Sequence, residues 1–399
     1  MKRLFALILL VSLLTSCGQA AATASSSQAA STVTPAPTVT PYPTAARSAA
    51  PTPSDSALPT ATPFVKLAKY DAAGLLSGTD KTTYEEGEYN PKDIFTYTFD
   101  EGTVFKGSED IAEEVLENGK NPGLGVRALH DAGITGEGVN VAIIDQPLQL
   151  DHPEYADNIA AYYDTGCDLP EDQGSYGGPA VASVLAGKTI GVAPGAKVYY
   201  AAVPVWKQDC KYFADALQWI IQQNRKLPEG QKIRVVSISY DLSSSYFSEN
   251  QDLYDNTVKL ALKQGILVLD CRYGVNTGLI GPAYYDPTSP EDVDKCRGGF
   301  PPTVGTGFTG NYVDVPCSYR TVAEELVKGS ASYAYWGQGL TNWAVPYGAG
   351  ILALGWQVNP NLSINDIVNM LQATCRVTTL NERIVDPAAF IAAVEATVK

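Results

Sequence analysis

Histidine is almost absent from this chain. Only two of its 399 residues are His, and its seven cysteines include no C-x-x-C pair. Zinc sites are built mainly from these two residue types, often at such close spacing. The sequence therefore argues against a metal site, and nothing in it indicates another cofactor.

Positive charge is also scarce. The chain has 28 Lys and Arg against 43 Asp and Glu, which gives a formal net charge of −15. A polyanion gains nothing from phosphate backbones, and anionic lipid repels it. We therefore expect no nucleic-acid partner, and any membrane association has to come from a source other than surface charge.

A long membrane-spanning run is missing as well. The apolar run from Leu4 to Leu14 has about eleven residues, too few to cross a hydrocarbon layer of about 30 Å. Lys2 and Arg3 precede it, and L-T-S-C ending at Cys17 resembles the lipobox of bacterial lipoproteins. We expect residues 1–17 to be a lipoprotein signal peptide and Cys17 to carry the lipid. The protein would then be extracytoplasmic and lipid-anchored to the bacterial cell membrane; an ordinary cleaved signal is the alternative.

Two segments separate this signal from the rest of the chain. Residues 18–63 are almost entirely Ala, Ser, Thr, Pro and Val, so they lack the large apolar side chains that would offset ordering, and we expect a disordered stalk. Residues 64–119 are acidic and aromatic, with strand-like alternation in FTYTFDEGTVF and a short helix in SEDIAEEVLENG. We interpret them as a packed N-terminal extension, with a role in folding as the alternative.

The remaining residues, 120–399, alternate strands with helices. Near-continuous apolar runs such as NVAIID, AKVYYAAVPV and IRVVSISY are separated by amphipathic segments such as YFADALQWIIQQN. This pattern predicts an α/β domain with a doubly wound, mostly parallel sheet covered on both faces. Functional groups of such sheets gather at the carboxyl ends of strands, and Asp145 lies at one. Residues 272–330 show little periodicity and are expected to form loops.

Three segments of this domain carry a family resemblance. They are GITGEGVNVAIID at 133–145, GGPAVASVLAGKTIGVAPG at 177–195 and NWAVPYGAGILAL at 342–354. Their order, their flanking glycines and their spacing resemble those of the subtilase family of serine peptidases. The nearest resemblance is to the lipoprotein-like subtilases of Firmicutes. The resemblance implies a subtilisin-like three-layer fold with triad positions at Asp145, Gly177 and Asn342. Only Asp145 is retained, because Gly177 stands at the His position and Asn342 at the Ser position.

The residues near the His position offer no obvious replacement base. Gly177 has no side chain, and the phenol of the adjacent Tyr176 has an ordinary pKa of about 10, poorly suited to a base at neutral pH. His130 is expected in a helix before the first strand. His152 belongs to the turn after Asp145, where the family keeps a His that is not catalytic.

The Ser and oxyanion positions are altered too. The amide of Asn342 is no nucleophile, and the hydroxyl of Thr341 is displaced by about 100° around a helix entry. Asn342 is alternatively interpreted as the N-cap of the following helix. In the family, an Asn after an apolar strand stabilises the oxyanion; here that position falls near Gly274, and Asn276 is displaced by two residues.

These substitutions lead to a functional expectation with open alternatives. We expect a catalytically inactive, membrane-tethered subtilase homologue that binds a peptide or protein partner at its remnant cleft. The alternatives are an active serine-type endopeptidase with a rearranged site and a structural cell-envelope lipoprotein. An open cleft would favour binding, whereas Tyr176, Trp343 and Tyr347 are near enough to fill it. Six cysteines beyond Cys17 are also expected to form at least one disulfide outside the cytoplasm.

Overall fold

The computed structural model describes residues 83–170, 173–272, 279–299, 301, 312–325 and 328–398. The expected signal peptide and stalk at residues 1–63, the lipidated Cys17 and the oxyanion positions Gly274 and Asn276 all lie outside the described residues.

The main sheet has five parallel strands in the order β5-β6-β4-β7-β8. Its strands are β4 (Asn140–Asp145), β5 (Ile159–Asp164), β6 (Lys197–Ala202), β7 (Ile233–Ile238) and β8 (Leu267–Asp270). The chain enters at the central strand β4, builds one side through β5 and β6, and then the other side through β7 and β8. The expected doubly wound, parallel sheet is therefore confirmed.

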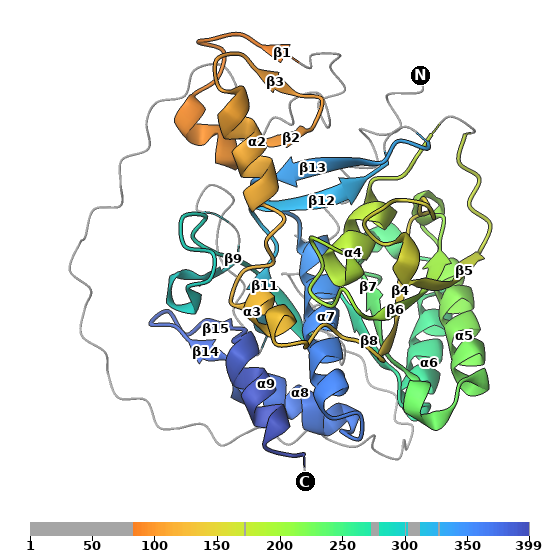
Figure 1. Ribbon diagram of the computed structural model, residues 1–399. Coiled ribbons are helices and arrows are strands. Elements are labelled where there is room, and N and C mark those ends of the chain that lie inside the picture. Colours follow the sequence, from red (N-terminus) through yellow and green to blue (C-terminus); the bar gives the residue numbers. More distant parts are fainter. Residues whose placement is uncertain are drawn as a thin grey trace, which may run out of the picture.

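Helices cover both faces of this sheet (Figure 1). The outer pair is α5 (Cys210–Lys226) and α6 (Gln251–Lys263), and the inner pair is α4 (Gly177–Ala186) and α7 (Ala344–Val358). Helix α5 buries the apolar stripe containing Phe213, Leu217 and Ile220. Helices α4 and α7 are apolar almost all round because other elements enclose them on every side. The result is the three-layer α/β architecture that the alternating pattern predicts.

A second sheet lies beyond α7 and corrects one expectation. Its order is β10-β9-β11-β15-β14, with strands β9 (Ile280–Tyr284), β10 (Arg297–Gly298), β11 (Val313–Pro316), β14 (Arg376–Val377) and β15 (Arg383–Ile384). Three of these strands fall within residues 272–330, which we expected to be loops. Their short length and high Gly and Pro content hid the strand periodicity. Helices α3 (Val126–Asp131), α8 (Ile364–Ala373) and α9 (Pro387–Glu395) complete the domain.

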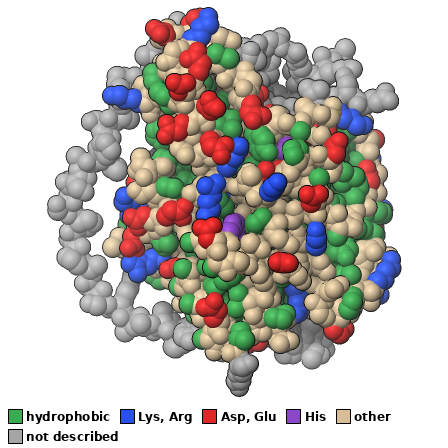
Figure 2. Space-filling view, viewed as in Figure 1, with side chains coloured by type: hydrophobic (Ala, Val, Ile, Leu, Met, Phe, Trp, Pro, Cys, Tyr) green, Lys and Arg blue, Asp and Glu red, His purple; other side chains and the backbone are tan. Residues whose placement is uncertain are grey.

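The N-terminal extension is joined to the domain through a third sheet. Its described part contains β1 (Thr83–Tyr84), β2 (Thr98–Asp100), β3 (Val104–Phe105) and α2 (Glu109–Asn118). Strand β2 pairs with β13 (Ser332–Trp336), which in turn pairs with β12 (Arg320–Glu324). The expected helix is confirmed at α2, and Figure 2 shows acidic side chains gathered over this end of the molecule. Because β2 adds to a hairpin of the domain, the extension is packed rather than detached.

Short 3-10 helices link several of these elements. They are η1 (Pro91–Thr96), η2 (Ala156–Asn158), η3 (Val205–Lys207), η4 (Glu229–Gln231), η5 (Ser245–Phe247), η6 (Val293–Lys295) and η7 (Thr341–Trp343). Within the described ranges, none of the helices is long and apolar enough to span a membrane.

The cysteines differ from expectation. Cys210, Cys296 and Cys317 are buried with free thiols, and the half-buried Cys167 and Cys375 carry free thiols as well. The expected disulfide is therefore wrong for this set. Burial raises the pKa of each of these thiols, so they act as small apolar side chains and not as redox groups.

Candidate functional site

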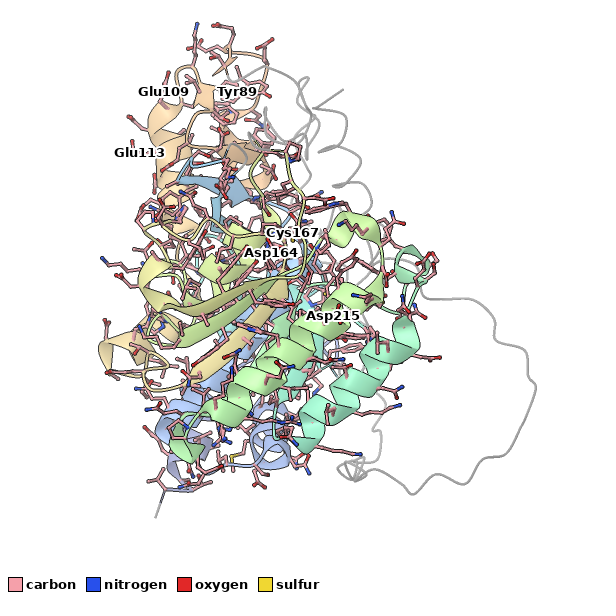
Figure 3. All side chains as sticks on the ribbon, turned by 90° about the vertical axis from the view of Figure 1, so that its right-hand side faces the viewer. Tyr89, Glu109, Glu113, Asp164, Cys167 and Asp215 are labelled. Atoms are coloured by element: carbon pink, nitrogen blue, oxygen red, sulfur yellow. The ribbon has the colours of Figure 1, made fainter. Side chains whose placement is uncertain are left out.

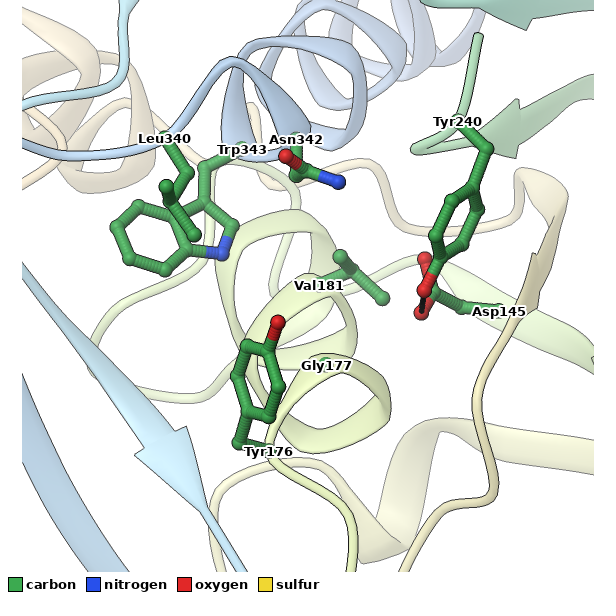
Figure 4. A pocket seen from close by; sticks show the side chains of 8 residues that line it. All are labelled: Asp145, Tyr176, Gly177, Val181, Tyr240, Leu340, Asn342 and Trp343. Carbon is green, nitrogen blue, oxygen red and sulfur yellow. Dashed lines mark hydrogen bonds between the residues drawn. The ribbon is translucent and has the colours of Figure 1, made fainter. Parts of the chain in front are cut away.

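The three positions that the sequence predicts for the triad meet in one small pocket between the main sheet and the two inner helices. Asp145 is the last residue of β4, Gly177 is the first residue of α4, and Asn342 lies in η7 directly before α7. All three line the pocket, together with Tyr176, Val181, Tyr240, Leu340 and Trp343 (Figure 4). The fold thus brings together the positions that the sequence motifs indicate, although they lie up to 197 residues apart, from position 145 to position 342.

Asp145 is a buried carboxyl with only one of its oxygens bonded. Its Oδ1 accepts hydrogen bonds from the backbone N–H of Gln146 at 2.8 Å and from the Tyr240 hydroxyl at 3.2 Å. Among the described residues, its Oδ2 has no hydrogen-bond partner. Burial raises the pKa of Asp145 to about 7, and the bond from Gln146 opposes this shift only in part. Near neutral pH a large share of molecules therefore carries a neutral carboxyl here.

The space beside Gly177 is taken by the side chain of Gln146. A Cβ on Gly177 would lie 3.0 Å from Cδ of Gln146 and 3.1 Å from Oδ1 of Asp145. The Gln146 amide donates to the Tyr240 hydroxyl at 3.1 Å and accepts from the Ser175 hydroxyl at 2.9 Å. A polar side chain fixed at both ends thus stands where a base would have to stand, and an amide cannot take up a proton at neutral pH.

Asn342 holds two elements together instead of reacting. Its Nδ2 donates to the backbone carbonyl of Ser239 at 2.5 Å, which ties η7 to the end of β7. Its side chain does not cap α7, so the interpretation as an N-cap is wrong. Thr341 is also buried but does not line the pocket. The described pocket therefore contains no hydroxyl at the nucleophile position.

Both histidines lie elsewhere. His130 is in α3, as expected, where its Nε2 lies 2.8 Å from the carbonyl of Val192. His152 is fully buried against Tyr155 and Tyr333, with its Nε2 3.3 Å from the Ser332 carbonyl. Neither ring lines the pocket, and burial lowers the pKa of each imidazole. The two imidazoles have structural contacts and do not replace the missing base.

Aromatic side chains close the pocket. Tyr176 and Trp343 line it, as the sequence suggested, whereas Tyr347 lies by Arg320 instead. Trp336 of β13 stacks on Tyr176 with ring centroids 6.2 Å apart and meets Trp343 edge-on at 4.9 Å. The space left is about 10 Å³, which corresponds to about one water molecule. No peptide side chain fits a space of this size.

Sequence reasoning missed Gln146, Ser175, Tyr240 and Trp336. Two of them carried a usable signal, because Gln146 and Tyr240 follow β4 and β7, two paired parallel strands whose carboxyl ends meet at one edge. Ser175 and Trp336 carried none. Trp336 packs on the pocket residues Tyr176 and Trp343 because the hairpin of β12 and β13 folds over α4, where the backbone N–H of Ala323 donates to the Ser183 hydroxyl at 3.0 Å.

Comparison with known proteins agrees with this geometry. Residues 136–269 match the family model of the subtilase family, Peptidase_S8. A probable subtilase-type serine protease of Deinococcus radiodurans is 35% identical over 107 residues, covering 20% of this chain and 15% of that protein. The segment that matches the family model contains Asp145, Gly177 and strands β4 to β7 of the main sheet, so this part of the chain is similar to the subtilase family. The match spans only about a seventh of the length of that relative.

Solved structures give weaker likenesses. A protease from Pseudoalteromonas arctica PAMC 21717 is 21% identical, with 69% of this chain and 95% of that chain covered and a TM-score of 0.49. Fervidolysin from Fervidobacterium pennivorans, a keratinolytic enzyme related to subtilisin, is 18% identical, with 70% of this chain and 47% of that chain covered and a TM-score of 0.49.

Proposed function

We propose that this chain is a non-catalytic member of the subtilase family that acts by binding a protein partner. The observation that carries the proposal is the composition of the pocket: Asp145 faces a glycine and an asparagine in a space for about one water. A serine peptidase needs a hydroxyl nucleophile, a base of suitable pKa and an acid to orient that base. The pocket supplies the third group alone.

We propose that the partner binds on the outer surface. A peptide in the remnant cleft would have to displace Trp336, Tyr176 and Trp343, which pack on one another. We therefore propose that a peptide or protein ligand binds away from the cleft. A purely structural envelope protein is the second candidate, favoured by the same closed pocket.

The location is proposed from the beginning of the sequence. The lipobox-like L-T-S-C ending at Cys17 and the stalk-like composition of residues 18–63 support a lipid anchor on the outer face of a bacterial membrane. Expression in a lipoprotein-competent bacterium tests this: the wild-type chain should partition into detergent, and Cys17→Ala should not. Equal partitioning of the two forms would contradict the anchor.

The absence of catalysis is tested with a fluorophosphonate probe and denatured casein. Neither labelling nor cleavage is expected, because loss of the Ser or the His alone lowers turnover about 10⁶-fold in subtilisin. Asp145→Ala is the matched control. Labelling or cleavage that this substitution abolishes would show that a rearranged active site exists.

A gain-of-function series sharpens the test. Gly177→His with Asn342→Ser restores two side chains but leaves Gln146 in the space of the new imidazole. We expect no cleavage from this pair and at most weak cleavage when Gln146→Gly is added. Strong cleavage by the double variant alone would mean that the pocket opens more readily than its packing indicates.

A further inference from the structure

Strand pairing joins the N-terminal extension to the domain. Strand β2 runs antiparallel to β13 and pairs with it over three residues. One residue further, Glu101 and Tyr333 exchange two bonds. The Glu101 N–H donates to the Tyr333 carbonyl at 3.2 Å, and the Glu101 carboxylate accepts from the Tyr333 N–H at 3.2 Å. We call the contact of residues 98–101 with residues 333–336 the extension joint.

Both parts that meet at the extension joint are acidic. Residues 83–119 have eleven Asp and Glu against two Lys, and residues 120–399 have 29 Asp and Glu against 20 Lys and Arg. Figure 3 shows Glu109 and Glu113 of α2 on the extension, at one end of the molecule. Charge therefore opposes the docking of the extension, so strand pairing and burial have to stabilise it.

A buried carboxyl lies on the neighbouring strand of the same sheet. Glu324 is the last residue of β12, is 4% exposed and lies opposite Ser332 of β13. The Ser332 hydroxyl donates to its Oε1 at 3.1 Å, while its Oε2 has no hydrogen-bond partner among the described residues. A buried carboxylate with an unbonded oxygen is unfavourable. Burial therefore raises the pKa of Glu324 to about 8.

Two carboxyls of the extension add to this effect. Successive side chains of a strand point to opposite faces, and Asp100 lies opposite Ala334, two residues after Ser332. Asp100 and Glu324 therefore project from the same face of the sheet, on either side of β13. The charges of Asp100 and Glu101 raise the pKa of Glu324 in addition to burial, and the bond from Ser332 opposes the shift only in part.

The other charged groups around these strands have partners of their own. Helix α4, which also packs on β12, has no titratable side chain. Arg320, at the far end of β12, donates to the carbonyl of Ile190 at 3.0 Å. The remaining groups interact in pairs, which are Lys120 with Glu117, Tyr333 with Glu154, and Lys328 with Glu325. In the described part of the chain, the charged form of Glu324 therefore has no cationic partner.

We propose that a proton controls the extension joint, which is closed while Glu324 is neutral and loosens when Glu324 ionises beside Asp100 and Glu101. Ionisation adds a third negative charge at the joint, and separation of β2 from β13 relieves the repulsion and lets water reach Glu324. Its pKa rises from 4.5 in water to about 8 in the closed joint. The resulting stabilisation is complete below pH 4.5 and is lost as the pH rises to about 8. The proposal does not depend on the lack of catalysis.

Hydrogen exchange of the full chain, followed by mass spectrometry between pH 5 and pH 9, tests the proposal. The measured quantity is the protection factor of peptides that cover the extension joint, which corrects for the faster intrinsic exchange at higher pH. It should fall about tenfold or more between pH 6 and pH 8 and then stay level, because each opening releases one proton in this range. Glu324→Gln stays neutral at every pH and should lose most of this fall.

Glu113→Gln is the matched control, because it removes one charge from the exposed face of α2, and it should behave as the wild type does. If Glu324→Gln does not fold, Asp100→Asn replaces it and should show a smaller fall that ends at a lower pH.

The proposal is overturned if the wild type keeps its protection between pH 6 and pH 8, or if Glu324→Gln loses as much protection as the wild type. A fall that Glu113→Gln removes would also overturn it, because the total charge of the extension would then be the cause. Equal protection of the joint and of β4 at pH 8 would do the same, because the joint would then open only together with the whole domain.

Discussion

Helix α4 begins beside one buried carboxylate and ends beside another, and the two are partnered very differently. At its end, Glu154 accepts hydrogen bonds from the backbone N–H groups of Thr189 at 2.7 Å and Ile190 at 2.8 Å, from the Thr189 hydroxyl at 3.0 Å and from the Tyr333 hydroxyl at 3.1 Å. At its beginning, Oδ2 of Asp145 has no partner among the described residues. Both side chains are at most 2% exposed.

The difference separates a carboxyl whose hydrogen bonds support the fold from a carboxyl that is only partly bonded. A buried polar atom without a hydrogen bond is unfavourable, so its retention needs a reason. In the catalytic triad an imidazole bonds the carboxylate. Where glycine replaces that imidazole, the carboxylate keeps its place on β4 and becomes hard to ionise. The hydrogen bonds of Glu154 explain its burial by the stability they contribute, whereas the bonds of Asp145 leave its Oδ2 unexplained by stability.

The largest expected loss of stability comes from substituting Glu154. Glu154→Ala leaves two buried backbone donors and two hydroxyls without their acceptor, so we expect the free energy of unfolding to fall by about 3–5 kcal/mol. Urea unfolding at pH 7 measures it. Glu154→Gln keeps one acceptor oxygen and should lose less. If Asp145→Asn destabilises as much as Glu154→Ala, the contrast between the two ends of α4 is not real.

The second-largest expected effect is a loss of stability with rising pH that is caused by Asp145. Because folding raises the pKa of Asp145 from 3.8 to about 7, folding favours its neutral form. The resulting stability is complete below pH 3.8 and is lost as the pH rises through 7. Between about pH 5 and pH 8 this group alone should lower the free energy of unfolding by about 2–3 kcal/mol.

The contribution of Asp145 to the pH dependence is measured by comparing unfolding curves of the wild type and Asp145→Asn at several pH values. Burial also raises the pKa of Asp314 to about 7 and of Glu324 to about 8, so the variant should keep part of the slope but have a shallower one than the wild type. Identical slopes for the two proteins would mean that Asp145 is ionised in the fold.

The smallest effects are expected at two glycines, one at each end of α4. A Cβ on Gly187 would lie 2.5 Å from the Ser183 carbonyl oxygen and 2.9 Å from Oε1 of Glu154, so Gly187→Ala should destabilise by about 1–2 kcal/mol. A Cβ on Gly177 would lie 3.0 Å from Cδ of Gln146 and 3.1 Å from Oδ1 of Asp145, which is tight but less close than the contacts at Gly187, so Gly177→Ala should destabilise by less than about 1 kcal/mol. Thermal unfolding of both variants checks that Gly187→Ala destabilises more than Gly177→Ala. The reverse result would show that α4 is packed more tightly at its pocket end.

Much of this protein could be inferred before any coordinates. Apolar runs separated by amphipathic segments determine a parallel sheet with helices on both faces. The apolar runs need cover on both sides, and each amphipathic helix has one apolar face with which to provide it. Ordered motifs around Asp145, Gly177 and Asn342 placed the family and the position of its site. Local sequence was enough here because each motif sits on a single strand end or helix start.

Only the tertiary structure decided whether that site is open. The rings of Tyr176 and Trp343, which line the pocket, both pack on Trp336, which lies 159 residues after Gly177, from position 177 to position 336, in a hairpin that the N-terminal extension joins through β2. The side chain of Gln146 fills the base's space only because Tyr240 and Ser175, on separate elements, hold both its ends. The ends of β4 and β7 could have indicated that Gln146 and Tyr240 lie near each other, but the contacts of Ser175 and Trp336 join segments whose order along the chain does not reveal their distance in space.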